Sequence, residues 1–122
     1  MRFVMFTYPD PEVAAAWDGM PVAERKAIVD DHLAWFNRHR PKLDGGEELE
    51  RPERARTIRR RAGEPLITDG PFTESKEIVG GFVILEGVDW EEAQQMALEW
   101  PSLHDPGARV ELWPVWARTP EV

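Results

Sequence analysis

The segment TDGPFTESKE at residues 68–77, followed directly by IVGGFVILE at residues 78–86, decides more about the fold than any other stretch of this sequence. Asp-Gly-Pro is strong turn chemistry, because Asp accepts local backbone hydrogen bonds, Gly tolerates positive φ and Pro fixes φ. The apolar run that follows predicts a strand over residues 81–86. We therefore expect Asp69 to be held rigidly in a turn between two strands.

The longer pattern consists of Asp-Gly-Pro-Phe, then Glu-x-Lys-Glu, then Gly-Gly followed by an aromatic residue. It closely resembles the signature of the DGPF-domain proteins, a branch of the YCII-related family. The resemblance runs from Phe3 to about Val115 and implies a dimeric α+β barrel in which two sheets pack together. It is a specific marker of family but a poor marker of function, because most of that family has no assigned reaction.

With 122 residues, 42% hydrophobic and 31% charged, the chain has the size and composition of one globular domain spanning residues 1–122. It contains no cysteine, which excludes disulfides, thiolate catalysis and Cys-ligated metal sites. No apolar run approaches the ~20 residues that span a membrane. The first strand-like segment is too short for a signal peptide. We expect a cytoplasmic protein without a membrane partner.

Fifteen basic and 23 acidic residues give a net charge of −8, which disfavours general binding to nucleic acid phosphates. The exception is a cluster of six arginines between Arg51 and Arg61. We expect this cluster to form the charged face of an exposed strand, balanced by the acidic residues that precede it. Binding of a substrate carboxylate is the alternative. No aromatic residues interleave with these arginines, so a nucleic-acid patch is disfavoured.

Hydrophobic periodicity and breaker residues predict the order of elements along the chain. Strands are expected at residues 2–8, 56–61, 65–68, 81–86 and 109–116, an extended segment at 47–50, and helices at 11–17, 21–40 and 89–100. The last helix has a capping-box-like start at Asp89, and its apolar residues at helical spacing are Ala93, Met96, Ala97 and Trp100. In the strand at 81–86, Phe82 and Ile84 lie on one face and Val83 and Leu85 on the other, and in the last strand one face holds Val110, Leu112 and Trp116. Two long helices on one face of an antiparallel sheet make an α+β, ferredoxin-like fold. The other face needs cover and is rich in aromatic residues, so we expect a homodimer.

The helix at residues 21–40 contains the first candidate catalytic residue, His32. At about 100° per residue this helix presents one apolar arc, formed by Ile28, Val29, Leu33, Trp35 and Phe36. His32 falls near the middle of the arc and should therefore face the sheet. It is either a structural histidine bonded to backbone, which spacing alone favours, or an acid/base, since histidine titrates near neutral pH.

The family resemblance implies the second role for His32. YCII-related proteins have a His on the first long helix and an Asp in the central turn, proposed to form a pair, and His32 and Asp69 occupy the matching positions. Asp69 would orient the imidazole and stabilise its protonated form, as the acid does in a catalytic triad. If Asp69 only forms the turn, His32 has no partner and the catalytic interpretation fails.

Candidate ligand contacts lie in and after the same turn. Phe72, Glu74 and Lys76 belong to the family motif, and Lys76 is the member suited to an anionic substrate. A structural alternative is equally open, in which Thr73 caps a short helical turn and the charges pair with each other.

The remaining aromatic and histidine residues give no indication of a metal or cofactor. Trp35 and Trp113 are candidate walls of an apolar pocket beside His32, although packing also explains them. His39 suits the end of its helix, and neither it nor His104 forms metal-ligand spacing with His32. The chain has no phosphate-cradling Gly loop, no Gly-x-Ser-x-Gly and no dinucleotide fingerprint. We therefore expect no metal and no cofactor.

Two functions stay open. The first is a cofactor-free enzyme that binds a small molecule and uses His32 and Asp69 for proton transfer, as an isomerase, lyase or hydrolase. Muconolactone isomerases and a chloromuconolactone dehalogenase have similar dimeric α+β barrel folds. This likeness supports proton abstraction next to a carbonyl, but only weakly, because one fold hosts many functions. The second is a non-catalytic ligand- or protein-binding module, such as the accessory partners in sigma-factor-linked regulation that DGPF-type domains resemble. A contact between His32 and Asp69 in an open cavity would favour the enzyme.

Overall fold

The computed structural model describes residues 1–71 and 78–117. In this part of the chain the strands are β1 (Arg2–Tyr8), β2 (Leu43–Glu48), β3 (Arg56–Arg61), β4 (Glu64–Asp69), β5 (Gly81–Glu86) and β6 (Arg109–Pro114). The helices are α1 (Pro11–Ala16), α2 (Val22–His39) and α3 (Trp90–Leu98), with short 3-10 turns η1 (Trp17–Gly19), η2 (Arg40–Lys42), η3 (Pro52–Arg54) and η4 (Pro101–His104). No helix among these residues is long and apolar enough to cross a membrane.

The main sheet, within the described residues, has four strands in the order β2-β5-β1-β6, and each neighbouring pair is antiparallel. Helix α2 connects β1 to β2, and α3 connects β5 to β6. This βαββαβ arrangement is the ferredoxin-like topology that the sequence predicted, with β3 and β4 inserted between its second and third strands. The α+β class and the ferredoxin-like fold are therefore confirmed.

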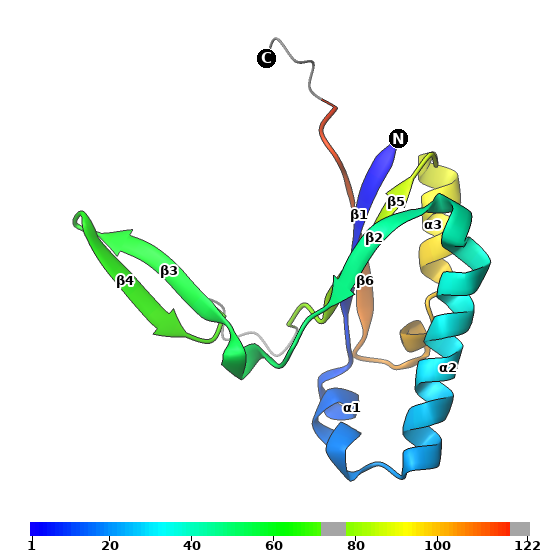
Figure 1. Ribbon diagram of the computed structural model, residues 1–122, viewed down its shortest axis with the longest axis horizontal. Coiled ribbons are helices and arrows are strands. Elements are labelled where there is room, and N and C mark those ends of the chain that lie inside the picture. Colours follow the sequence, from blue (N-terminus) through cyan, green and yellow to red (C-terminus); the bar gives the residue numbers. More distant parts are fainter. Residues whose placement is uncertain (72–77, 118–122) are drawn as a thin grey trace.

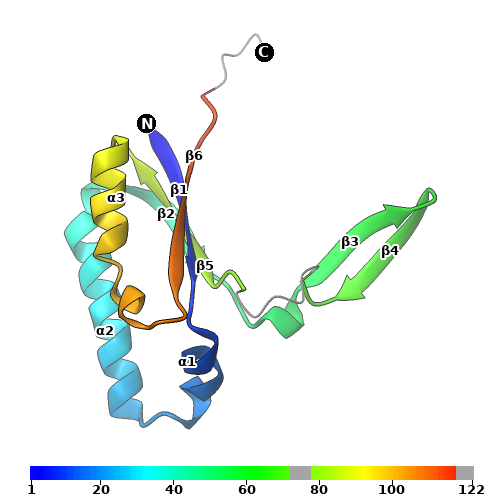
Figure 2. The same ribbon diagram turned by 180° about the vertical axis from the view of Figure 1, so that it is seen from behind.

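Both long helices cover the same face of this sheet (Figure 1, Figure 2). Side chains alternate along β1, so Phe3, Met5 and Thr7 are buried on the helix side while the residues between them point to the opposite side. Strand β5 alternates as its pattern predicted, and Val83 and Leu85 are buried on the helix side. The sheet thus has one helix-covered face and one open face.

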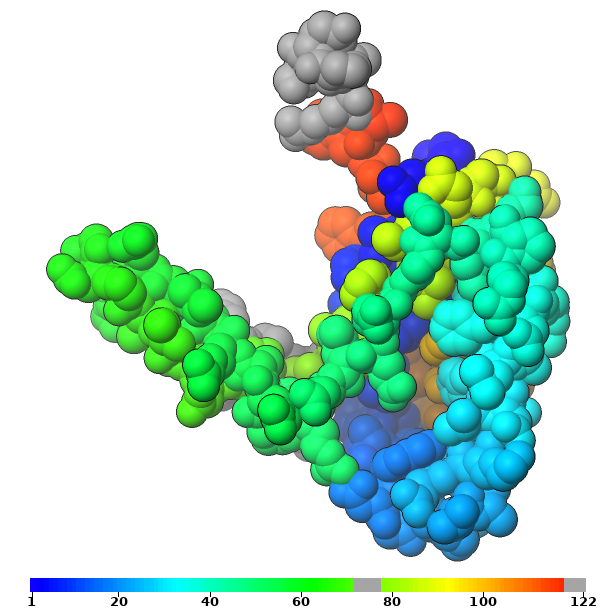
Figure 3. All heavy atoms as spheres, viewed as in Figure 1, coloured from blue at the N-terminus to red at the C-terminus, as the bar shows by residue number. Residues whose placement is uncertain are grey.

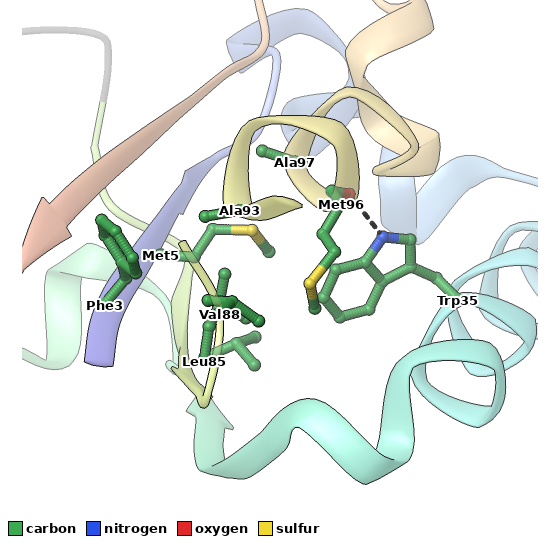
Figure 4. Close-up of a cluster of buried hydrophobic side chains, with 9 residues drawn as sticks. Phe3, Met5, Trp35, Leu85, Val88, Ala93, Met96 and Ala97 are labelled. Atoms are coloured by element: carbon green, nitrogen blue, oxygen red, sulfur yellow. Dashed lines mark hydrogen bonds between the residues drawn. The ribbon is translucent and has the colours of Figure 1, made fainter. Parts of the chain in front are cut away.

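The core forms where α2 and α3 meet the sheet, and Trp35 is its largest fully buried side chain (Figure 4). Its indole Nε1 donates a hydrogen bond of 2.9 Å to the backbone carbonyl of Met96, which satisfies the one polar atom that the ring buries. Helix α3 buries Met96 together with Ala93 and Ala97, at the helical spacing predicted for its inner face. Asp89 caps this helix by accepting a backbone N–H of its first turn, also as predicted.

The apolar arc predicted for α2 is only partly buried. Ile28 and Phe36 are half-buried, but Val29 and Leu33 are 44% and 53% exposed. The N-terminal part of α2 runs past the end of the sheet towards α1 (Figure 1). Val29 and Leu33 lie at the edge of the arc furthest from buried Trp35, so the buried stripe is narrower than the arc. The prediction that Val29 and Leu33 face the sheet was wrong.

Two element ends also differ from the prediction. Helix α3 ends at Leu98, two residues before the predicted end at residue 100. Strand β6 ends at Pro114 rather than at residue 116. Trp116 therefore lies beyond the strand and is 76% exposed, and the prediction that it shares a strand face with Val110 and Leu112 was wrong. Beyond Pro114 the Val115 N–H still donates to the Arg2 carbonyl at 2.9 Å, at the N-terminal end of β1.

Strands β3 and β4 form a separate two-stranded hairpin, residues 56–69, which we call the arm. The arm projects away from α2 and α3, on the side of the open face (Figure 1, Figure 2). At its tip Ala62 and Gly63 both have positive φ, 51° and 82°, as a two-residue hairpin turn requires. The two strands were predicted, but their separation from the main sheet was not. Four of the six residues of β3 (RTIRRR) are arginines, so the strand has no continuous apolar face that could join the core.

Candidate functional site

The open face of the main sheet is the candidate site. Its side chains come from alternate positions of three neighbouring strands. They are Val4, Phe6 and Tyr8 of β1, Phe82 and Ile84 of β5, and Arg109, Glu111 and Trp113 of β6. All are half-buried except Trp113, which is exposed, and the long helices of the described chain lie on the other face. A polar group on the edge strand β6 thus lies beside the apolar and aromatic side chains of β1 and β5, and the ion pair of Arg2 and Glu86 lies at the other end of the same face.

The polar group is centred on the carboxylate of Glu111. Tyr8 donates its hydroxyl to Glu111 Oε1 at 3.3 Å, and the indole of Trp113 donates to the same oxygen at 3.1 Å. Arg109 donates through Nε to Glu111 Oε2 at 3.2 Å, and its guanidinium lies over the Tyr8 ring, 3.9 Å from the ring centroid. We call these four residues the Glu111 cluster.

The cluster keeps its carboxylate ionised. The hydrogen bond from Trp113, reinforced by the bond and charge of Arg109, lowers the pKa of Glu111 below its usual range against the opposing effect of burial. Burial and the neighbouring Glu111 charge raise the pKa of Tyr8. At neutral pH the cluster therefore presents a carboxylate, a neutral phenol and a guanidinium. The side chains of Arg109 and Glu111 are 37% and 36% exposed, so solvent screens their ion pair and its contribution to stability is small.

This arrangement is suited to orienting a ligand. A carboxylate has about four lone-pair sites, so Glu111 can accept a hydroxyl of a bound molecule in addition to its three present donors. The Arg109 guanidinium places positive charge beside it, and the surrounding aromatic rings offer surfaces for stacking. Small-molecule sites in general combine mostly apolar walls with a few placed polar groups. The open face has this composition.

His32 lies on α2, on the opposite side of the sheet from the Glu111 cluster. Its Nδ1 is 2.7 Å from the carbonyl oxygen of Ile28, and its Nε2 is 2.8 Å from the hydroxyl of Ser102. A carbonyl oxygen can only accept a hydrogen bond, so Nδ1 carries the proton and donates to it. In that tautomer of the ring, Nε2 accepts a hydrogen bond from the Ser102 hydroxyl. The ring also contacts Trp100 edge-on, with centroids 4.8 Å apart. These contacts tie α2 to η4 and match the structural interpretation of His32.

The structure does not bring His32 and Asp69 together within one chain. Asp69 is exposed at the end of β4, opposite Arg56, in the arm that projects from the other side of the sheet. The Asp-Gly-Pro turn itself forms as expected, since Gly70 has a φ of 84° and its N–H donates to the Ala55 carbonyl at 2.7 Å. The departure of the arm from the main sheet separates the two residues.

The other predicted contacts lie in different places. Outside the described residues are Phe72, Glu74 and Lys76. Trp35 is 1% exposed and packed among three aromatic rings, so its side chain offers no surface to a ligand in this conformation. Trp113 lies on the open face, opposite Val4 in the β1–β6 register, and therefore does not line a pocket beside His32. The prediction for Trp113 was wrong because the helix-facing positions of β6 are its even-numbered ones.

The two other histidines lie at element ends, where His39 is largely buried and His104 is exposed. His39 Nε2 lies 3.5 Å from Glu99 Oε1 without making a hydrogen bond, while Arg38 donates to the same oxygen at 2.7 Å. His104 is exposed at the end of η4. Within residues 1–71 and 78–117, no group of three or more His, Cys, Asp or Glu side chains is arranged to hold a metal ion.

Sequence reasoning missed the Glu111 cluster, although β6 contained a signal for it. Arg109, Glu111 and Trp113 alternate with Val110 and Leu112, so the strand has one polar and one apolar face. The prediction for this strand rested on the apolar face alone. The polar face shares its side of the sheet with the aromatic residues of β1, a relation that only the strand register shows.

The model of the YCII-related domain family matches residues 1–116. The chain belongs to the YCII-related domain family. Another protein similar to this YCII-related chain is an uncharacterized protein of Rhizobium meliloti (strain 1021), 30% identical over 99 residues that cover 80% of this chain and 77% of that protein.

A similar solved structure is 5-chloro-2-hydroxyhydroquinone dehydrochlorinase (TftG) from Burkholderia phenoliruptrix AC1100, in complex with 2,5-dihydroxybenzoquinone. It is 20% identical to this YCII-related protein, with a TM-score of 0.51, and the match covers 93% of this chain and 94% of that one. At this identity the likeness concerns the fold.

Proposed function

We propose that this YCII-related protein belongs to the DGPF branch and is a cytoplasmic homodimer that binds a small molecule against its open face, oriented by the Glu111 cluster. The observation that carries the proposal is an ionised carboxylate that has three donors and lies beside the apolar and aromatic side chains of the sheet face. A face that served packing alone would favour apolar side chains, since burying an ion pair costs desolvation free energy. Branch membership rests on the Asp-Gly-Pro-Phe signature at residues 69–72.

The second copy forms the other wall of the chamber in this proposal. Two sheets that pack face to face enclose the side chains of their inner faces, here the aromatic residues and the Glu111 cluster. Excluding water from this space strengthens the electrostatic interactions of Glu111 and Arg109 with a ligand. The structure of TftG with 2,5-dihydroxybenzoquinone supports a small ligand, because that protein has a similar fold.

The side chains define the class of ligand. A hydroxyl group donates to Glu111, and a carbonyl or carboxylate oxygen accepts from Arg109. The rings of Phe6 and Phe82 favour a planar or alicyclic body over a long flexible chain. We therefore propose a small cyclic molecule that carries both a hydroxyl and an oxygen acceptor.

Isothermal titration with hydroxylated quinones, phenols and benzoates tests the ligand site, beginning with 2,5-dihydroxybenzoquinone. The chain contains no cysteine, so the quinones cannot react covalently with a protein thiol. We expect Glu111→Gln to raise the Kd of any binding compound at least tenfold. The amide lacks the negative charge that strengthens the hydrogen bond from the ligand hydroxyl. Glu91→Gln, at an exposed carboxylate in the first turn of α3, is the matched control and should bind like wild type.

Two results would overturn the proposal. No binding across the panel, or equal affinity in wild type and Glu111→Gln, would remove the ligand site. Light scattering at micromolar concentration that gives the 14.0 kDa mass of one chain would remove the homodimer.

Acid/base catalysis by His32 and Asp69 is a separate hypothesis within this proposal. It requires Asp69 from a second copy, because the two residues of one chain lie on opposite sides of the main sheet. Proton transfer of the isomerase, lyase or hydrolase type would exchange a carbon-bound proton of a ligand in D2O, visible by NMR. The hypothesis predicts that both His32→Asn and Asp69→Asn abolish this exchange. Exchange that survives both substitutions, or none in wild type, favours the non-catalytic binding module, including a partner in sigma-factor-linked regulation.

A further inference from the structure

The arm has little support within the single chain. Among the described residues, β3 and β4 pair with each other in a sheet of their own. An isolated two-stranded hairpin is marginally stable at best in water. Ile58 and Ile67 are cross-strand partners near the centre of one arm face, yet they are 71% and 59% exposed. Burial of such a pair against another surface would stabilise the hairpin.

The isoleucine pair has polar and charged neighbours on the same face of the arm. The register places Arg56 opposite Asp69 on one side of the pair and Arg60 opposite Pro65 on the other. We call these residues, with Ile58 and Ile67, the isoleucine face. An apolar centre with a charged rim is the usual anatomy of a protein–protein interface.

The charge of the arm differs in sign from that of the rest of the chain. Residues 56–69 contain four arginines and two acidic residues, a net charge of +2. The whole chain carries −8, so the remaining residues carry −10. The body of a second copy therefore carries a net charge opposite in sign to that of the arm, which favours association.

The arm projects at an angle from the main body, on the side of the sheet away from α2 and α3 (Figure 1, Figure 3). The arm and the open face therefore form the two sides of one concave region. A second copy whose open face meets that of the first lies inside this angle, beside the arm. Two-fold symmetry then places the arm of the second copy beside the first.

We propose that each arm of the homodimer embraces the other copy and buries its isoleucine face there. This inference rests on the homodimer of the proposed function and deepens it. It assigns Ile58 and Ile67 to the interface. Asp69 lies on the same face of the arm and would therefore also contact the partner copy.

The absence of native cysteine allows single introduced thiols to test the contact. Ile67→Cys and Thr68→Cys place thiols on opposite faces of β4, at neighbouring positions that are both exposed in the single chain. At protein concentrations where the dimer forms, maleimide alkylation should be at least tenfold slower for Ile67→Cys than for Thr68→Cys. Equal rates with a dimeric protein would overturn the embrace and leave the homodimer standing.

A second measurement does not depend on thiols. The double variant Ile58→Lys/Ile67→Lys should raise the dimer dissociation constant at least tenfold by sedimentation equilibrium, while Thr68→Lys changes it less than twofold. Near-ultraviolet circular dichroism of the aromatic side chains confirms that the main body is folded in each variant. An unchanged dissociation constant in the double variant would overturn the inference.

Salt and the wild-type mass separate this inference from the proposed function. Raising NaCl from about 0.05 to 0.5 M should weaken the dimer, since arginine–carboxylate contacts near the surface are screened. A salt-independent dimer would contradict the contact between the arm and acidic residues. A monomeric wild type would overturn both the embrace and the homodimer, whereas ligand binding through Glu111 is tested by its own titration.

Discussion

Replacing Ser102 by alanine removes the hydroxyl that donates a hydrogen bond of 2.8 Å to His32 Nε2. This bond connects α2 to η4. This substitution distinguishes a structural histidine from an acid/base residue. If His32 ties the two elements together, its contact with Ser102 contributes to the free energy of unfolding. If its main role lies in a pair with Asp69, the energetic coupling should appear there instead.

The magnitudes follow from the contacts. One neutral hydrogen bond contributes about 0.5–1.5 kcal/mol net, so Ser102→Ala should lower the free energy of unfolding by that amount. His32→Phe keeps a ring against Trp100 but loses the bonds to Ser102 and to the Ile28 carbonyl, which together cost about 1–3 kcal/mol. The double variant should lose less than the sum, with a coupling of about 0.5–1.5 kcal/mol.

Urea unfolding of the four proteins measures this cycle. The protomer concentration must be held fixed, because association shifts apparent stability. Asp69→Asn tests the alternative pair and should show no energetic coupling to His32→Phe if His32 is structural. Additive effects of His32→Phe and Ser102→Ala would refute the structural tie. Coupling between His32 and Asp69 would support the acid/base pair.

Three further predictions concern the fold. Trp35→Phe should cost about 1–3 kcal/mol in thermal or urea unfolding, because it loses the buried hydrogen bond to the Met96 carbonyl and leaves a cavity; no loss would place the ring outside the core. Hydrogen bonds from the backbone N–H groups of Gly107 and Glu12 lower the pKa of Asp10. Its stabilisation is therefore present above the unfolded value of about 3.9 and is lost as pH falls through the lower folded pKa, so Asp10→Asn should flatten the acid limb of stability against pH. Replacing residues 50–79 by Asn-Gly should leave a cooperatively folding body, because β2 and β5 are antiparallel neighbours and the buried core lies outside that segment; loss of near-ultraviolet dichroism would contradict this.

The elements of the main sheet were predictable because their signals are local. Alternation along β5, the Asp89 cap and the buried spacing in α3 each specify structure within a few residues. The failures on α2 have a different cause. Whether Val29 and Leu33 are covered depends on how wide a stripe of the helix meets its neighbours, and helical periodicity contains no information about that width.

The candidate site was less predictable because it depends on register. Glu111 lies more than one hundred residues from Tyr8 in sequence, and pairing of β1 with β6 brings them together. The family resemblance directed attention to His32 and Asp69 instead. The arm then separates those two residues in the single chain, and its path away from the main sheet follows from a strand that has no apolar face.

The apolar side chains of the open face and of the arm are only partly buried by the described residues of one chain. A small ligand reaches a few side chains of the open face but does not pack against Ile58 and Ile67 of the arm. A second copy accounts for both features at once, since it brings a sheet to the open face and a body of opposite net charge to the arm. Enclosing Glu111 in that interface costs desolvation free energy unless a polar group completes its hydrogen bonds. A hydroxylated ligand would complete them, so ligand binding and dimer formation should stabilise each other by the same free energy. Sedimentation with and without ligand measures that coupling, and an unchanged dimer dissociation constant would place the ligand outside the interface.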